Sequence, residues 1–380
     1  MPTVFVPKES RDGETRVAAT PETVKALVKE GFEVLMEPSA GAGAYFADQS
    51  YLDAGASTAT DAASARGAAD VIMMVNPPTP DEARNLKEGA VLVSLLWPLS
   101  NTDVVGVLRD RKVTAFALDR IPRISRAQGM DALSSQSNIA GYKAVLLAAQ
   151  SLPRLMPLMM TAAGTIKPAR VVVLGAGVAG LQAIATARRL GAVVEVSDVR
   201  SAVKEQVMSL GGRFIEVEGM EDLEDAGGYA REASKEFLER QKALVRKHIV
   251  NADAVITTAL IPGKPAPRLI SADVVREMKN GSVIVDMAVE QGGNCELSEN
   301  GRDVVREGVN IIGRPNIPAL VPTHASEVFA RNVLAVTRHL FPKAEPNLDF
   351  DDEINDGAIV VHAGVVRDDA VAAALDGGDK

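Results

Sequence analysis

Short apolar runs, rich in β-branched residues, alternate along the chain with longer stretches in which apolar residues recur every three or four positions. The short runs are typical of buried strands, and the longer stretches are typical of helices with one apolar face. Such an alternation predicts βαβ units, and therefore parallel sheets that are covered by helices. The chain contains two series of this kind, one in its first third and one that starts near Arg170.

We expect the strands of the first series at Val4–Val6, Glu33–Met36, Asp70–Val75, Val91–Leu95 and Val113–Leu118. We expect those of the second series at Val171–Leu174, Val193–Ser197, Arg213–Glu216, Ala254–Thr257, Val283–Asp286 and Asn310–Ile312. Helices fall between the strands, for example at Pro21–Glu30 and Thr102–Arg111. The first of these helices has Thr20 as its N-cap, proline at its first position and Gly31 just past its end.

Two long helices flank the second series, one at Ser135–Ser151 and one at about Thr323–Leu340. The second long helix carries a mostly apolar face, formed by Val328, Phe329, Asn332, Val333, Val336 and Leu340. We therefore expect an α/β protein with two Rossmann-like, doubly wound parallel-sheet domains that are joined by long hinge helices. Residues 1–135 plus 323–380 would form the first domain, and residues 136–322 the second. The tail after Phe341 is rich in Pro, Asp and Gly, which predicts a surface-wrapping or loosely ordered segment.

Composition narrows the classes of protein that the chain can belong to. The 380 residues include 41 basic and 50 acidic side chains, and this net charge of −9 argues against a nucleic-acid-binding protein. The only cysteine, Cys295, cannot form an internal disulfide, which fits a reducing compartment. The four histidines are scattered, so we expect no metal site. The N-terminus does not resemble a signal peptide, and Pro153, Arg154 and Pro157 interrupt the most apolar stretch, so we expect a soluble chain.

The strongest chemical motif lies at the start of the second series. Strand Val171–Leu174 runs into Gly175-Ala176-Gly177-Val178-Ala179-Gly180, and a helical stretch follows. This is the G-x-G-x-x-G turn of a dinucleotide site in the expected strand–turn–helix context. Gly175 allows the tight turn, Gly177 lets the backbone approach a pyrophosphate at the helix N-terminus, and Gly180 lets helix and strand pack closely.

An acidic residue follows the next strand. Asp198 lies about 20 residues past the glycine turn, where a carboxylate accepts hydrogen bonds from the adenosine ribose and repels a 2′-phosphate. The sequence thus favours NAD(H) over NADP(H). Arg200, two residues further on, could serve a 2′-phosphate, but we give the acid more weight.

Several long segments resemble the family of alanine dehydrogenases and transhydrogenase alpha subunits. The N-terminal segment Pro7-Lys8-Glu9 with Gly13–Pro21 resembles the opening that both groups share. The segments that look specifically like transhydrogenase are Pro122–Tyr142 and Met159–Thr165. Further matches are Gly227–Ala230, Thr257–Pro267 and Val285–Asn294. The resemblance covers nearly the whole chain.

Two departures separate this sequence from alanine dehydrogenases, which carry a substrate lysine in a Val-Lys-Glu-Pro segment and a catalytic histidine in a Leu-His-Leu segment. The matching positions here are Asn76 and Trp97. Asn76 cannot replace the lysine, and Trp97 cannot transfer a proton, whereas an oxidative deaminase needs a base near its substrate. Arg16 matches the carboxylate-binding arginine, and we interpret it as structural.

The resemblance therefore implies the NAD(H)-binding subunit of a proton-translocating, Re/Si-specific NAD(P) transhydrogenase. Hydride would pass directly between NAD(H) bound here and NADP(H) on a partner subunit, so positioning rather than acid–base chemistry would supply the catalysis. The implied partners are membrane-spanning subunits with their NADP(H)-binding domain, and a second copy of this chain in a homodimer. The chain would lie in the cytoplasm, peripheral on the inner membrane through these partners.

The resemblance also implies the site residues. Arg123, Gln128, Asp131 and Ser134 would surround the nicotinamide, with Asp131 and Ser134 bonded to the carboxamide and Gln128 facing the partner's nucleotide. An acidic, glycine-rich stretch ending at Gly228 and Tyr229 would be a mobile lid, with the tyrosine closing over the nucleotide. The implied cofactor-binding set is completed by Arg126, Gly175, Gly177, Val178, Gly180, Asp198, Val199, Arg200, Gly228, Gln241 and Leu260. An alanine-type amino-acid dehydrogenase and a non-catalytic NAD(H)-binding redox sensor remain as alternatives.

Overall fold

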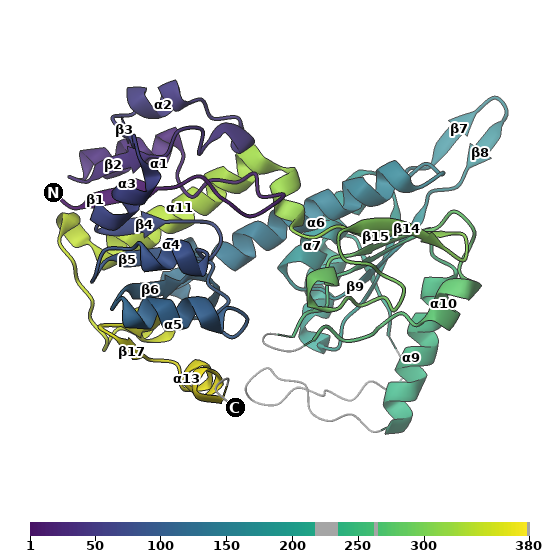
Figure 1. The fold of residues 1–380 in the computed structure, drawn as a ribbon. Helices are drawn as coiled ribbons and strands as arrows, with labels where there is room; N and C mark the ends of the chain where they lie inside the picture. Colours follow the sequence, from purple (N-terminus) through teal and green to yellow (C-terminus); the bar gives the residue numbers. More distant parts are fainter. Residues whose placement is uncertain (217–234, 262–264, 378–380) are drawn as a thin grey trace. The chain divides into compact units, whose positions relative to one another are not determined.

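The computed structural model describes residues 1–216, 235–261 and 265–377, and its chain divides into two compact units (Figure 1). Unit 1 comprises Met1–Gln136 and Ala319–Lys380, and unit 2 comprises Ser137–Pro318. Within the described residues, no helix is long and apolar enough to cross a membrane.

Unit 1 is built on an eight-stranded sheet with the strand order β17-β16-β6-β5-β4-β1-β2-β3. The strands from β1 to β6 are parallel, whereas β16 runs antiparallel to β6 and β17 antiparallel to β16. The strands are β1 Thr3–Val6, β2 Glu33–Met36, β3 Ser57–Thr58, β4 Val71–Met73, β5 Val91–Ser94, β6 Thr114–Ala117, β16 Ile359–His362 and β17 Val365–Val366. The helices of this unit are α1 Pro21–Lys29, α2 Asp48–Asp53, α3 Ala62–Ala68, α4 Pro80–Arg84, α5 Thr102–Asp110, α11 Pro322–Leu340, α12 Glu353–Ala358 and α13 Asp369–Gly377.

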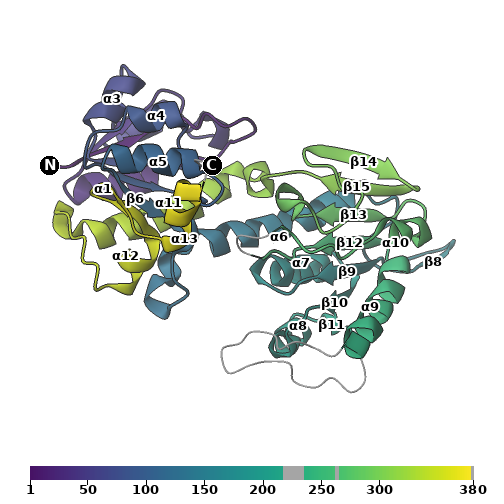
Figure 2. The same ribbon diagram turned by 60° about the horizontal axis from the view of Figure 1, so that its bottom comes forward.

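Unit 2 contains a seven-stranded sheet with the strand order β11-β10-β9-β12-β13-β15-β14, in which β14 alone is antiparallel to its neighbour. Its strands are β9 Arg170–Leu174, β10 Val193–Ser197, β11 Arg213–Phe214, β12 Ala254–Thr257, β13 Val283–Asp286, β14 Arg302–Arg306 and β15 Val309–Gly313. Its helices are α7 Val178–Arg189, α8 Lys204–Ser209, α9 Lys235–Val250 and α10 Ala272–Glu277. A separate hairpin of β7 Met159–Thr161 and β8 Gly164–Ile166 projects from the rest of unit 2 in both views (Figure 2).

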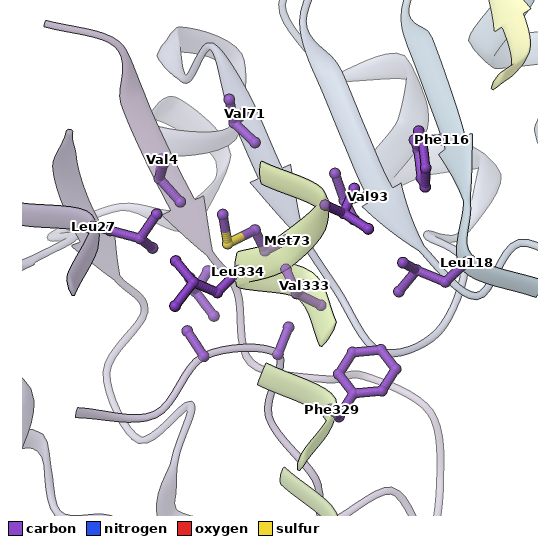
Figure 3. Close-up of a cluster of buried hydrophobic side chains, with 14 of the residues drawn as sticks. Val4, Leu27, Val71, Met73, Val93, Phe116, Leu118, Phe329, Val333 and Leu334 are labelled. Carbon is purple, nitrogen blue, oxygen red and sulfur yellow. The ribbon is translucent and has the colours of Figure 1, made fainter. Parts of the chain in front are cut away.

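The central strands are buried on both faces because helices cover each side of a parallel sheet. In β4, Val71 and Met73 join one apolar cluster, while Ile72 and the following Met74 join the cluster on the other face. The first cluster also receives Phe329 and other residues of α11 (Figure 3). The β9 strand of unit 2 shows the same alternation, since Val171 and Val173 lie in one cluster and Val172 and Leu174 in the other. The expected fold class of two doubly wound α/β domains is therefore confirmed.

The boundaries of two helices show how single side chains set local structure. Thr20 caps α1 through a capping box with Thr23. The long helix α6 (Ala132–Ser151) begins at Ala132, three residues before the expected start. It does so because the Asp131 carboxylate accepts a hydrogen bond from the Ser134 N–H at 2.8 Å, which satisfies a free N–H group of the first turn.

The C-terminal tail differs from its prediction as a loosely ordered segment. Residues after Phe341 form α12 and then β16, whose Ile359, Val360 and Val361 are buried against the sheet of unit 1. Three consecutive apolar residues are a strand signal, and the polar composition around them concealed it.

We predict that Gly141→Ala lowers the free energy of unfolding of unit 2 by about 1–3 kcal/mol, the usual cost of overpacking. A Cβ atom at Gly141 on α6 would lie 2.1 Å from the Ala179 carbonyl oxygen on α7. Denaturant unfolding of the purified chain measures the change. Gly106→Ala on α5 is the matched control, because its Cβ would meet nothing closer than Leu375 Cδ2 at 3.5 Å. Equal stability of Gly141→Ala and the wild type would contradict the close crossing.

Candidate functional site

The turn between β9 and α7 shows three glycines with different physical reasons to be there. Gly175 has φ of +102°, and a Cβ on it would lie 2.5 Å from Thr258 Oγ1. A Cβ on Gly180 would lie 1.9 Å from the Gly175 carbonyl oxygen. Gly177, by contrast, has no atom within 4 Å of its Cβ position, and it lies at the N-cap of α7. Gly175 and Gly180 are therefore set by packing, whereas Gly177 leaves open space in front of a helix N-terminus.

This open space fits a pyrophosphate. The first turn of α7 has N–H groups without helical acceptors, and its dipole favours an anion there. A side chain at Gly177 would fill the space that the phosphates would take. The turn also lies at the point where the sheet order reverses, because β9 is flanked by β10 on one side and β12 on the other. Ligands of doubly wound sheets bind at that position.

Asp198 braces the turn as well as facing the expected ribose position. Its side chain is 8% exposed, and its Oδ2 accepts a hydrogen bond from the Ala176 N–H at 2.6 Å. Its Oδ1 accepts the Arg200 backbone N–H at 2.9 Å and the Arg200 Nε–H at 3.1 Å. The carboxylate thus ties the Gly-rich turn to the end of β10 and holds the arginine that a 2′-phosphate would need. Val199, between the two, is 63% exposed.

The segment that the resemblance assigned to the nicotinamide forms a 3₁₀ turn before α6 in unit 1. Asp131 and Ser134 are brought together, with Ser134 Oγ donating to Asp131 Oδ2 at 2.5 Å. Arg123 and Gln128 are exposed to solvent. Arg126 instead forms an ion pair with Asp352.

The remaining expected residues are spread over unit 2. Leu260 follows β12 and is 47% exposed, two residues beyond the Thr258 that contacts the glycine turn. Gln241 lies on α9 and is partly buried. Gly228 and Tyr229, the expected lid residues, lie outside the described residues. Thr258 was missed by the sequence analysis, although its place directly after a central strand at the switch point could have marked it.

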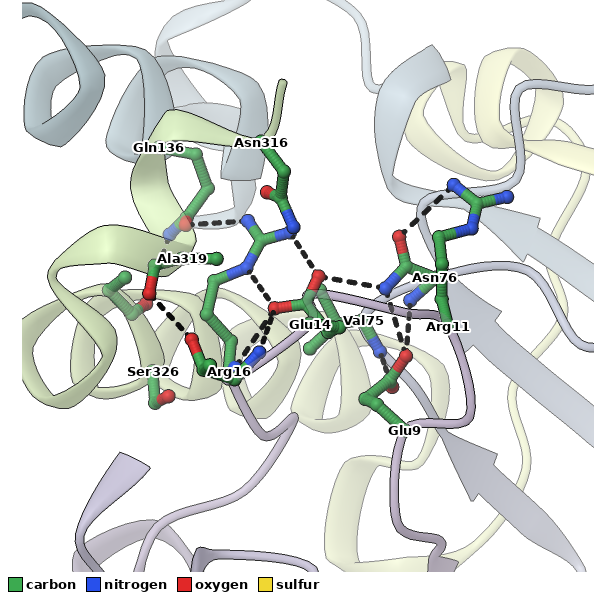
Figure 4. Close-up of polar contacts among 12 residues, drawn as sticks. Glu9, Arg11, Glu14, Arg16, Val75, Asn76, Gln136, Asn316, Ala319 and Ser326 are labelled. Carbon is green, nitrogen blue, oxygen red and sulfur yellow. Dashed lines mark hydrogen bonds and ion pairs between the residues drawn. The ribbon is translucent and has the colours of Figure 1, made fainter. Parts of the chain in front are cut away.

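The corresponding switch point of unit 1, between β1 and β4, is filled by a polar network (Figure 4). Arg16 is 5% exposed, and its Nε and Nη2 donate to the two carboxylate oxygens of Glu14 at 2.8 and 2.7 Å. Its Nη1 donates to Gln136 Oε1 at 2.9 Å. The Asn76 amide nitrogen donates to both Glu14 and Glu9, at 2.9 and 3.0 Å. The chain's own carboxylate therefore occupies the arginine fork.

The two carboxyl groups of this network have opposite pKa shifts. Burial raises the pKa of Glu9 to about 7, although the Val75 N–H and the Asn76 groups donate to it. Burial also acts on Glu14, but the hydrogen bonds and charge of Arg16 outweigh it and lower the pKa of Glu14 to about 2. At neutral pH, Glu14 is therefore the counter-ion of Arg16, while Glu9 is partly protonated.

Trp97 follows β5, the strand next to β4 in the sheet of unit 1. It has φ of +45°, which is unusual for a large side chain. Four hydrogen bonds hold this backbone: the Leu96 and Trp97 N–H groups donate to Asp119 Oδ1, and the Asn101 amide donates to the Leu96 and Trp97 carbonyls. The strain is thus imposed by a built turn, and the side chain it presents has no acid–base chemistry.

Comparisons with known proteins place the chain in a family. Residues 5–140 match the family model described as alanine dehydrogenase/PNT, N-terminal domain, and residues 144–369 match the C-terminal domain of the same description. These matches and the two Rossmann-type units define a two-domain protein of the alanine dehydrogenase/PNT class.

Individual relatives narrow this class. The chain is 52% identical over 372 residues to the first segment of NAD(P) transhydrogenase subunit alpha from Rhodospirillum rubrum, with 96% of this chain and 97% of the relative covered. A solved transhydrogenase structure from Sinorhizobium meliloti is 44% identical, with a TM-score of 0.88, and the match covers 96% of this chain and 99% of that one. A solved L-alanine dehydrogenase is 28% identical with a TM-score of 0.82, covering 99% of both chains. The chain therefore belongs to the transhydrogenase alpha subunits of this family.

We predict that one glutamate carboxyl, that of Glu9, titrates near pH 7. Carbon-13 NMR of the side-chain carboxyl groups measures its midpoint, and the resonance should be missing in Glu9→Gln. Since the folded pKa lies above the ordinary value of 4.5, protonation of Glu9 stabilises the fold below pH 4.5. This contribution is lost as the pH rises from 4.5 through about 7. If every glutamate titrated below pH 5.5, the burial of Glu9 would be wrong.

Proposed function

We propose that this chain is the NAD(H)-binding subunit of a proton-translocating, Re/Si-specific transhydrogenase that serves direct hydride transfer to or from NADP(H) on a partner subunit. The observation that carries the proposal is the glycine turn of unit 2, braced by Asp198 and open at Gly177. Relatives named NAD(P) transhydrogenase subunit alpha support the reaction class. Coupling to proton movement would belong to the membrane subunits.

The residues of the chain would bind and orient the cofactor. The α7 N-terminus and Gly177 would hold the pyrophosphate, and Asp198 with Arg200 would select a ribose without a 2′-phosphate. Bound NAD(H) would supply the hydride-carrying nicotinamide. Because the Ser134 hydroxyl proton is donated to Asp131, the Ser134 oxygen is left as an acceptor for the carboxamide N–H group.

The exposed side chains before α6 would complete the nicotinamide environment. Arg123 and Gln128 lie free to face a nucleotide that is held by a partner. Arg126 would exchange its contact with Asp352 for a phosphate oxygen. Tyr229 and Gly228 would belong to the lid, and Leu260 with Gln241 would line the pocket.

The polar network of unit 1 argues against an amino-acid dehydrogenase. A keto acid needs a free cationic group and a base, but the Arg16 fork is bonded to Glu14 and position 76 is a neutral amide. Trp97 cannot accept or donate a substrate proton. A redox sensor would need only the nucleotide site, and the absence of activity on reconstitution with membranes would favour it.

The proposed partners are membrane-spanning subunits that carry the NADP(H) site, which would place this chain peripherally on the cytoplasmic face of the inner membrane. We also propose a homodimer that forms through the β7–β8 hairpin. This hairpin is an isolated two-stranded sheet, which is marginally stable alone. Its exposed apolar residues make a surface suited to a second copy in a two-fold arrangement. Those residues, with their exposed fractions, are Leu158 55%, Met159 42%, Met160 77% and Ile166 45%.

Reconstitution tests the proposed reaction. We predict that membranes from cells lacking this chain catalyse NADPH-driven reduction of an NAD⁺ analogue only when the purified chain is added back. Gly177→Val should fold, because its side chain enters open space, but should lower the activity at least about tenfold by blocking the pyrophosphate.

The control variant for reconstitution is Gly106→Ala, which lies in unit 1 and should match the wild type. Activity without the added chain, or none with it despite NADH binding, would contradict the transhydrogenase assignment. In the second case, the sensor function would take its place.

Sedimentation tests the homodimer. We predict that the wild type sediments at twice the mass of one chain, and that Met160→Asp shifts the equilibrium toward the monomer by at least about tenfold, because a charge would be buried in the interface. Met208→Asp is the matched control, since Met208 is also an exposed methionine of unit 2, 58% exposed, but lies on α8. Dimers of equal strength in Met160→Asp would show that the hairpin is not the interface.

A further inference from the structure

The sequence motif from Asp286 to Asn294 has no role in the candidate site of unit 2, although it resembles the transhydrogenase segments closely. It begins at the last residue of β13. The Asp286 side chain is fully buried, and five donors surround its carboxylate. They are Thr257 Oγ1 at 3.1 Å, Ala288 N–H at 3.0 Å, Asn294 N–H at 3.1 Å, Cys295 N–H at 2.9 Å and Ser298 Oγ at 2.7 Å. A buried charge with this many dipoles fixes the loop around it.

The two glycines of the motif allow the chain to pass close to this carboxylate. Gly292 and Gly293 have φ of +95° and +79°, in the region that favours glycine. A Cβ on Gly293 would lie 2.7 Å from Asp286 Oδ2. The chain therefore turns tightly around Asp286 and delivers Asn294 to a fixed position. Cys295, the next residue, is buried in the same turn.

Asn294 uses this fixed position to hold both ends of the loop that follows β12. Its amide nitrogen donates to the Ala259 carbonyl at 2.9 Å and to the Pro267 carbonyl at 2.8 Å. Its Oδ1 accepts the Ala259 N–H at 3.1 Å. One fully buried amide thus reads both backbone groups of Ala259 and closes the loop at Pro267.

The held end of this loop touches the glycine turn. Thr258, the residue before Ala259, donates through Oγ1 to the Gly175 carbonyl at 3.1 Å and through its N–H to the Leu174 carbonyl at 2.9 Å. A continuous set of contacts therefore runs from Asp286 through Asn294 and Ala259 to Gly175. Leu260 is the next residue after the clamped position.

We propose that Asn294, oriented by Asp286, is a positioning residue for the nicotinamide half of the dinucleotide. The proposal rests on the proposed function, because it takes the Gly175–Gly180 turn as the pyrophosphate site. The Asp198 that would hold the adenosine ribose follows β10, on one side of β9, and the clamped loop follows β12, on the other side. A dinucleotide that crosses the switch point puts its two halves on these opposite sides. Asn294 therefore acts on one half only.

Binding of NADH and of AMP to the full chain, measured by calorimetry, tests the proposal. Asn294→Ala removes three hydrogen bonds to the loop, so we expect its NADH dissociation constant to rise about tenfold. The AMP dissociation constant should stay within about twofold, because AMP contacts only the adenosine side. General damage to unit 2 would weaken both ligands together, so the ratio of the two constants separates positioning from folding. Asn251→Ala is the matched control, because its amide also bonds a backbone carbonyl in unit 2, that of Lys247, but on a helix end.

A milder variant covers the case in which Asn294→Ala does not fold. Ser298→Ala removes one of the five donors to Asp286 and should raise the NADH constant about threefold, again without a change for AMP. Unchanged NADH binding in the folded variant, or equal losses for both ligands, would overturn the proposal. A wild-type chain that does not bind NADH would instead overturn the proposed function, so the two failures are distinguishable.

Discussion

Both sheets place the strand that enters first near their centre, β1 in unit 1 and β9 in unit 2, and the chain then builds outward in both directions. The loops at the carboxyl ends of the two middle strands must therefore part, which leaves a crevice that side chains or a ligand have to fill. Unit 1 fills it with the Glu9, Asn76, Glu14 and Arg16 network, whereas unit 2 lines it with glycine backbone. The same constraint thus gives one closed edge and one edge suited to a nucleotide.

The buried charges of the two units are stabilised in different ways. Glu14 has a full ionic partner in Arg16, and removing either would leave an uncompensated buried charge, the costly case for an ion pair. Asp286 is held only by hydrogen-bond donors of its own and neighbouring loops. Because those donors are backbone and hydroxyl groups, the charge fixes chain path rather than a side-chain pair. Asp198 combines both kinds of contact, which suits a residue that must brace a turn and also face a ligand.

The sequence was sufficient for the central regions of the fold because their signals are local. The apolar runs of β1, β4 and β9 and the glycine turn are visible without knowledge of their neighbours. The antiparallel edge strands were not visible: β16 pairs with β6, far away in the chain, and its apolar run lies within a polar tail. The contacts of the candidate site were equally hidden, since neither the capture of Arg126 by Asp352 nor the bonding of Asn76 to two glutamates follows from spacing. Which residues are needed could be inferred from motifs, but which partner each one takes depends on tertiary packing.

The burial of Cys295 has a practical consequence for labelling chemistry. Desolvation raises the pKa of this thiol, so at neutral pH it stays protonated and out of reach of maleimides and disulfide reagents. The natural chain is therefore already a silent background for site-directed probes. A cysteine introduced on the surface of each unit would carry a spin label or dye without competition from the native thiol. The separation between unit 1 and unit 2 could then be followed by dipolar spectroscopy or energy transfer while nucleotides bind.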